Sequence, residues 1–215
     1  MLPARILNDP VEVGARLEQL FGVTKDELVR VAHAVLMARN ESVSVDPMNA
    51  KGQLMYIRGT REIRSVFMRK GWVIDRTGNI EATFSEERGA KIIYQNADSA
   101  SDPTREPRAI SGKGPAAVRM VEDGQMFIFP EWEAQRRRQR EEARKRDSAA
   151  AWFFCASVNG EEIVAELSCP RAVEGDQFKG FHERIFIIAP GEWGGFDLSK
   201  FEPEGQDFDV VVTRK

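Results

Sequence analysis

The segment WFFCASVNGEEIVAELS, residues 152–168, constrains the fold more than any other stretch of the chain. Its centre, Asn159-Gly160, is a preferred dipeptide of the type I′ turn in a two-residue β-hairpin. Pairing outward from this turn places alternate residues on one face of an antiparallel sheet. That face holds Trp152, Phe154, Ala156, Val158, Ile163, Ala165 and Leu167. The other face is mixed, because it carries Glu162 and Glu166 beside Phe153, Cys155 and Val164, so we expect one core face and one half-solvated face.

Two further apolar runs predict strands in the same part of the chain. They are ERIFIIA at residues 183–189 and FDVVVT at residues 208–213, with the glycine-rich stretch GEWGGF between them. The residues from 150 to 215 therefore predict an antiparallel β-rich part.

The N-terminal third carries the start and stop signals of helices. Asp9 is placed to cap a helix that begins at Pro10, and Gly22 stands where that helix should end. The sequence TKDE at residues 24–27 has the pattern of a capping box. The helix that follows has a buried stripe at helical spacing, formed by Leu28, Val31, Ala32 and Val35.

Residues 47–84 have the element order of a winged helix-turn-helix. Pro47 starts a weak helix over 48–58, Gly59 ends it, and Thr60 caps a second helix over 61–70. The stretch 72–84 then predicts two short strands around the turn at residues 76–79. A further strand is expected over residues 90–95.

The middle of the chain is predicted to be a connection. Residues 96–115 are rich in Ser, Asp, Pro and Gly and predict a long loop, and residues 118–129 predict a hairpin centred on Asp123-Gly124. Residues 130–147 predict a charged helix with Pro130 in its first turn and basic residues toward its end. Because this helix has no broad apolar face, we expect a solvent-exposed spacer that can bind phosphate as a second use.

Together these signals predict an α+β protein with a helical N-terminal part, a linker helix and an antiparallel β-rich C-terminal part. We divide it into residues 1–95, a helical part with a β-hairpin; residues 96–149, the long loop, hairpin and charged linker helix; and residues 150–215, the antiparallel part.

Composition limits the classes of partner. The 31 Lys and Arg side chains against 34 Asp and Glu side chains give a formal charge of −3, so any contact with nucleic acid must come from a local patch. Two cysteines do not suit a disulfide-stapled secreted domain. The N-terminus has no apolar signal-peptide core, and no apolar run reaches the roughly 18–20 residues of a membrane span. We expect a cytoplasmic protein without a membrane partner.

The familiar catalytic and cofactor motifs are missing. The chain has no HExxH, CxxC or GxSxG motif and only two histidines, so we expect neither a metal site nor a cofactor. SGKG at residues 111–114 does not have the spacing of a phosphate-binding loop and is more simply a mobile loop. Cys169 and His182 could form a thiolate–imidazole pair, although packing roles explain both residues more simply. We lean toward a non-enzymatic protein and assign no catalytic residue.

Local basic surfaces point to nucleic acid. In the winged form, Arg61, Arg64 and Ser65 would face base edges or phosphates, and Arg76 and Asn79 would reach the adjacent backbone. The charge run RRRQREEARKR at residues 136–146 would add phosphate contacts that do not depend on sequence. Its candidate residues are Arg136, Arg137, Arg138, Arg140 and Arg144.

Residues 91–117, KIIYQNADSASDPTREPRAISGKGPAA, resemble a stretch in uncharacterised proteins carried by bacterial integrative elements, plasmids and prophages. The resemblance implies an accessory role in mobile-element biology, either regulation or interference with a host defence system. It brings no site residues.

We therefore expect a regulatory accessory protein that contacts nucleic acid. The first alternative is a protein-binding module or inhibitor that docks on a host or phage protein through the exposed aromatic residues Trp132 and Trp193. A third is an enzyme whose reaction the sequence does not name. The sequence leaves the partner and the oligomeric state open.

Overall fold

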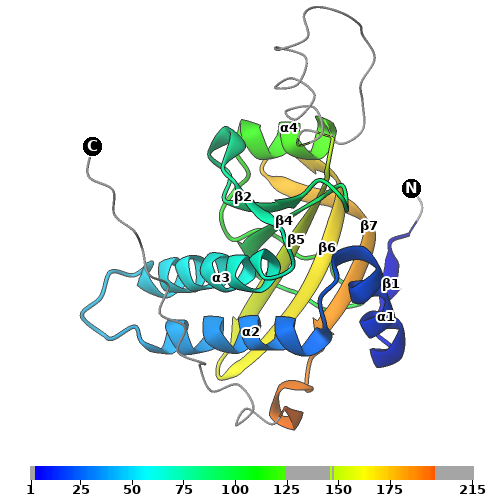
Figure 1. Cartoon of the computed structure of the whole chain (residues 1–215). Coiled ribbons are helices and arrows are strands. Elements are labelled where there is room, and N and C mark those ends of the chain that lie inside the picture. The colour runs from blue at the N-terminus through cyan, green and yellow to red at the C-terminus, as the bar shows by residue number, and fades with distance from the viewer. Residues whose placement is uncertain (1–2, 124–145, 147, 197–215) are drawn as a thin grey trace, which may run out of the picture.

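The computed structural model describes residues 3–123, 146 and 148–196 (Figure 1). The N-terminal elements are β1 (Arg5–Leu7), α1 (Pro10–Phe21), α2 (Lys25–Asn40) and α3 (Ala50–Met68). They are followed by β2 (Val73–Asp75), the 3₁₀ helix η1 (Thr77–Asn79), β3 (Ala82–Ser85) and β4 (Ala90–Asn96). The later elements are α4 (Pro115–Asp123), β5 (Ala150–Asn159), β6 (Glu162–Glu174), β7 (Gln177–Ile188) and the 3₁₀ helix η2 (Trp193–Gly195).

The seven described strands form one mixed sheet in the order β1-β7-β6-β5-β4-β3-β2. β1 is parallel to β7 and β4 is parallel to β5, whereas the other neighbours are antiparallel. Since helices dominate the N-terminal part and strands the C-terminal part, the predicted α+β class is confirmed. The β4–β5 pair joins the strands before residue 97 to those after residue 149, so strands of both halves share one sheet.

Both faces of the sheet are covered. The helices α2 and α3 lie side by side over one face, where the larger apolar cluster contains Phe21, Phe67 and Phe154 (Figure 1). On the other face, α4 and the connection 97–114 cover a second cluster that contains Phe153 and Phe178. The side of the β5–β6 hairpin that was expected to be half-solvated is therefore mostly buried.

The predicted capping signals are confirmed. Asp9 accepts hydrogen bonds from the backbone N–H groups of Val11 and Glu12, both at 3.0 Å. Thr24 and Glu27 form a complete capping box at the start of α2. These bonds satisfy N–H groups that a helix leaves without an internal partner, and they fix where α1 and α2 begin.

The predicted hairpin over residues 152–168 is also confirmed, but its two-residue turn is Gly160-Glu161 and not the predicted type I′ turn at Asn159-Gly160, because Asn159 belongs to β5 and has no positive φ. Asn159 lies opposite Glu162 and Val158 opposite Ile163, with Gly160 at a φ of 64°. The alternation of faces is as expected, because Trp152, Phe154 and Leu167 all belong to the helix-side cluster. The strands predicted over 72–84 and 90–95 correspond to β2, β3 and β4.

The predicted loop over 96–115 is observed between the end of β4 at Asn96 and the start of α4 at Pro115. Hydrogen bonds and buried side chains attach it to the sheet. Ala97 forms an isolated bridge with Ala109, and Ala109 exchanges two hydrogen bonds of 3.0 and 3.1 Å with the Gln177 side chain. Ala100 and Ala109 are both buried. The segment is thus a packed layer over the second face.

A buried ion pair anchors this layer. Arg184 binds the Glu166 carboxylate in a bidentate manner, with distances of 2.9 Å from Nε to Oε1 and 2.6 Å from Nη2 to Oε2. Its Nη1 donates to the Asp102 carbonyl at 2.9 Å, and the Ser101 backbone N–H donates to Glu166. The expectation of a half-solvated Glu166 is wrong, because the side chains of Glu166 and Arg184 are 0% and 2% exposed.

The predicted hairpin over 118–129 is wrong in its described part, because residues 115–123 form the helix α4. Pro115 stands at the first helical position, where its missing N–H costs no hydrogen bond. Val121 and Met120 turn into the second apolar cluster, so helical rather than alternating spacing explains these apolar residues.

The predicted break between two helices at Gly59-Thr60 is also wrong, since α3 runs without interruption from Ala50 to Met68. Gly59 is there because Tyr94 lies against it: a Cβ at this position would be 2.3 Å from the Tyr94 ring. Without two helices and a turn, the winged helix-turn-helix is not confirmed.

The charged helix predicted over 130–147 and the strand predicted over 208–213 lie outside the described residues, except for Arg146. Within the part of the chain that the structure describes, none of the helices has both the length and the apolarity that a membrane span requires.

Candidate nucleic-acid interface

The five residues predicted to contact nucleic acid near α3 lie on two adjacent elements. Arg61, Arg64 and Ser65 belong to α3, whereas Arg76 and Asn79 flank and end η1. Glu81 joins the two elements, because its Oε2 accepts hydrogen bonds from both Arg64 Nη2 and Arg76 Nε. The hydrogen bond from Arg64 holds the pKa of Glu81 below its usual range, so this link is present at neutral pH.

A second ion pair fixes the turn that carries Arg76 and Asn79. Asp75 Oδ1 accepts from the Thr77 N–H at 3.1 Å and from the Thr77 hydroxyl at 2.6 Å, which closes the turn. Asp75 Oδ2 lies 2.8 Å from the Lys91 ammonium, and both side chains are buried. Although burial acts to raise the pKa of Asp75, the hydrogen bonds from Lys91 and Thr77 lower it below its usual value.

This part of the chain is locally basic. Residues 50–85 contain seven Lys and Arg side chains against three Asp and Glu side chains, a net charge of +4 in a chain whose total is −3. A local excess of this kind is what phosphate contact requires when the whole molecule is slightly acidic.

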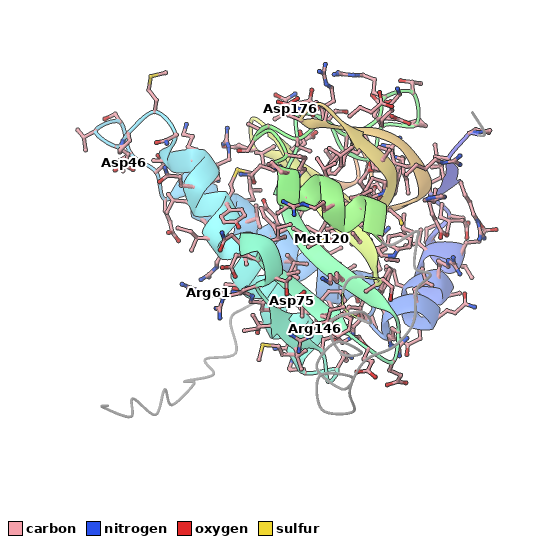
Figure 2. The ribbon with its side chains drawn as sticks, turned by 90° about the horizontal axis from the view of Figure 1, so that it is seen from above. Asp46, Arg61, Asp75, Met120, Arg146 and Asp176 are labelled. Atoms are coloured by element: carbon pink, nitrogen blue, oxygen red, sulfur yellow. The ribbon has the colours of Figure 1, made fainter. Side chains whose placement is uncertain are left out.

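The arginines differ in how available they are. Arg61 is exposed on the outer side of α3 (Figure 2) and forms no hydrogen bond or ion pair with another described residue. Arg64 is mostly covered and bound to Glu81, so it supports the turn more than it faces solvent. Ser65 accepts a hydrogen bond of 3.2 Å from exposed Arg69, and its hydroxyl is thus engaged within α3.

Two further basic positions were not predicted to belong to this surface. Arg69 extends it at the end of α3, and Arg119 extends it on α4. α4 lies beside η1, since a Cβ at Gly78 would stand 3.1 Å from the Ala116 Cβ, and Arg119 follows Ala116 by one helical turn. Arg119 was missed because residues 118–129 were interpreted as a β-hairpin, and a hairpin does not place Arg119 on a helix beside η1.

We call this set of residues the α3 surface. It consists of Arg61, Arg64, Arg69, Arg76, Asn79 and Arg119.

The other predicted contact residues do not add to it. Arg136, Arg137, Arg138, Arg140, Arg144 and the aromatic anchor Trp132 lie outside the described residues. Trp193 is described and belongs to η2, where its ring stacks on His33 with centroids 6.0 Å apart and packs on the helix-side core. A partly buried, stacked indole offers less surface to a partner than the exposed anchor that was expected.

The alternative catalytic pair is not assembled. Cys169 pairs with Glu183 across β6 and β7, and His182 is exposed at the irregularity beside it. Burial raises the pKa of Cys169 to about 12, so the thiol stays protonated at neutral pH and is a poor nucleophile. Among the residues that the structure describes, no three His, Cys, Asp or Glu side chains are grouped to hold a metal ion.

Lys113 of the SGKG segment turns inward. Its Nζ donates to the Gln95 side-chain oxygen and lies 4.8 and 4.7 Å from the centroids of the Phe153 and Phe178 rings. The rings favour the ammonium, but burial prevails and lowers the pKa of Lys113 to about 8. The amine therefore faces aromatic rings, not the open concavity that a phosphate site needs.

This burial predicts a pH-dependent effect on stability. The contribution of Lys113 to the free energy of unfolding, measured as wild type minus Lys113→Met, should rise between pH 8 and about 10.5, because the folded state releases the Lys113 proton before the unfolded state does. Cys155, Cys169 and Tyr94 have raised pKa values and act in the opposite direction in both proteins, so they cancel in this difference. Lys113→Met should therefore stabilise the protein by on the order of 1–3 kcal/mol below pH 8, with little gain above pH 10.5. Urea unfolding of both proteins at several pH values measures the difference. A gain that is the same at all pH values would assign the effect to packing instead.

Comparison with protein-family models, with curated proteins and with solved structures found no match to this chain.

Proposed function

We propose that the protein binds nucleic acid through the α3 surface. The observation that carries the proposal is the basic patch itself: residues 50–85 have a net charge of +4, and the fold gathers their exposed arginines with Arg119 of α4 on neighbouring elements. Arg61 and Arg76 can neutralise phosphates, and the ion pairs of Glu81 and Asp75 hold the turn in place for that contact. The resemblance of residues 91–117 extends the proposal to an accessory or regulatory role in a bacterial mobile element.

The test is fluorescence anisotropy with labelled oligonucleotides at about 50 and 200 mM salt, where phosphate contacts lose most affinity. Arg61→Ala/Arg69→Ala should weaken binding and reduce the slope of log K against log salt concentration by about one for each phosphate contact removed. The matched control is Arg5→Ala/Lys179→Ala, which removes two positive charges from β1 and β7 at the opposite side of the sheet. Equal losses in the two double variants would contradict a local interface.

A protein partner is the second candidate, and a different observation favours it. Six of the ten large apolar side chains that are exposed in the described residues lie in the connection between α2 and α3, in the last turn of α2 or in the first two turns of α3. They are Met37, Val43, Val45, Met48, Tyr56 and Ile57. The connection projects from the molecule, with Asp46 near its tip (Figure 2). Exposed apolar side chains gathered in this way are typical of docking surfaces.

Substitutions distinguish nucleic-acid binding from protein docking. If the projecting connection docks on a protein, Val45→Ser/Met48→Ser should abolish capture of one defined partner and leave oligonucleotide binding unchanged. Arg61→Ala/Arg69→Ala should give the reverse result. A partner retained by the Val45→Ser/Met48→Ser variant would exclude this connection as its docking site.

A further inference from the structure

The position of α3 limits the form of nucleic acid that it can contact. α3 lies close to the sheet because Gly59 faces the Tyr94 ring and the Gly52 carbonyl accepts a hydrogen bond of 2.8 Å from the Asn96 amide. α2 packs along its side (Figure 1). A recognition helix about 10–12 Å in diameter must project in order to enter a major groove about 12 Å wide. A helix that packs on the sheet beneath it and on α2 beside it offers only its outer strip to a partner.

An aromatic ring stands at this strip on a rigid support. Tyr56 is 42% exposed, and its ring centroid lies 6.4 Å from that of the buried Tyr94. The Tyr94 hydroxyl donates to Asn96 at 2.8 Å, and Asn96 in turn binds α3, so the floor beneath Tyr56 is fixed. A half-exposed ring supported from below by a second ring is suited to stack on an unpaired base.

The Tyr56 ring and Arg64 lie on the same flank of α3. Tyr56, Thr60 and Arg64 follow one another at intervals of four residues, which places them along one side of the helix. Eight residues of helix span about 12 Å, so a short run of nucleotides reaches from Tyr56 to the Arg64–Glu81–Arg76 link. Arg61 borders the same path on the outer side of α3.

We infer that the nucleic acid bound by the α3 surface is single-stranded, with one base stacked on Tyr56 and the phosphates following α3 toward Arg61 and Arg76. This inference rests on the proposed function and names its substrate class. Stacking on an aromatic ring tolerates every base, so binding should show little sequence preference.

The test compares a labelled 20-nucleotide single strand of mixed sequence with its own duplex by anisotropy at about 50 mM salt. The single strand should bind more tightly. Tyr56→Ala should weaken single-strand binding about 5- to 150-fold, the range measured for loss of one stacked base, and Tyr56→Phe should stay within about twofold of wild type. Thermal unfolding of each variant checks that the fold is intact.

The outcomes of this test distinguish failure of the single-strand inference from failure of the proposed nucleic-acid binding. Duplex binding that equals or exceeds single-strand binding, or single-strand binding that Tyr56→Ala leaves unchanged, overturns the inference while an Arg61-dependent interface survives. Absence of binding to both forms overturns the proposed function as well. If Tyr56→Phe loses as much affinity as Tyr56→Ala, the hydroxyl and not the ring makes the contact, and the stacking model is wrong.

Discussion

Replacing Arg184 with alanine is expected to lower the free energy of unfolding by about 3–5 kcal/mol, the largest effect that we predict for a single substitution. The substitution leaves the Glu166 carboxylate buried without its bidentate partner and removes the donor to the Asp102 carbonyl. Because Ser101 also binds Glu166, the layer 97–114 should detach at lower urea concentration. Urea unfolding by circular dichroism measures the loss.

An exposed pair in the same layer provides the control. Arg105 lies 3.7 Å from Asp98 with both side chains largely exposed, so Arg105→Ala should cost no more than about 1 kcal/mol. A third variant tests the cause of the effect. Glu166→Leu/Arg184→Met should recover part of the stability, because it removes the orphaned charge but leaves the Ser101 N–H and the Asp102 carbonyl without their partners. Similar small losses in Arg184→Ala and Arg105→Ala would show that water reaches the Glu166 site.

Gly59→Ala is expected to lower the free energy of unfolding by about 1–3 kcal/mol, against the normal preference of a helix for alanine. The added Cβ would stand 2.3 Å from the Tyr94 ring, which is buried and held by Asn96. Either α3 must move away from the sheet or the ring must shift, and both disturb the helix-side core. Thermal or urea unfolding detects the change.

Gly14→Ala is the matched control, since no atom lies within 4 Å of a Cβ built at this position in α1. It should raise the free energy of unfolding by about 0.5–1 kcal/mol, the usual gain for replacing glycine in a helix. If the two substitutions change stability in the same direction, the close approach of α3 to Tyr94 is not what restricts residue 59.

The parts of the fold that the sequence predicts well are those decided by near neighbours. Asp9, the Thr24–Glu27 box and the glycine of the β5–β6 turn, Gly160, all act within three residues, so a single sequence predicts the helix starts and the hairpin, although it places the turn one residue too early. Gly59 was misinterpreted as a helix end because the need for a glycine comes from the close approach of Tyr94, a residue on a strand that comes later in the chain. Glu166 was assigned to solvent because its partner Arg184 and its cover, Ser101, come from other elements.

The residues of the candidate site were likewise predicted where they are close in sequence and missed where tertiary packing brings them together. The pattern of charges pointed to Arg61, Arg64 and Arg76, and their short separation in sequence kept them together when the two expected helices proved to be one. Arg119 and Tyr56 escaped notice because their place at the α3 surface depends on tertiary packing. Arg119 requires α4 to lie beside η1, and Tyr56 requires the support of Tyr94.

The two parallel strand pairs have a consequence for the order of folding. β4 hydrogen-bonds to β5 across more than fifty residues of intervening sequence, and β1, the first strand, pairs with β7, the last described one. Such pairings close large loops before they yield contacts, which slows folding. A chain emerging from the ribosome can form α1, α2 and α3 early, but β1 has no partner until residue 185 has been made. The unfinished protein therefore exposes unpaired β-strand edges during most of its synthesis, and we expect folding to be completed only as the last third of the chain appears.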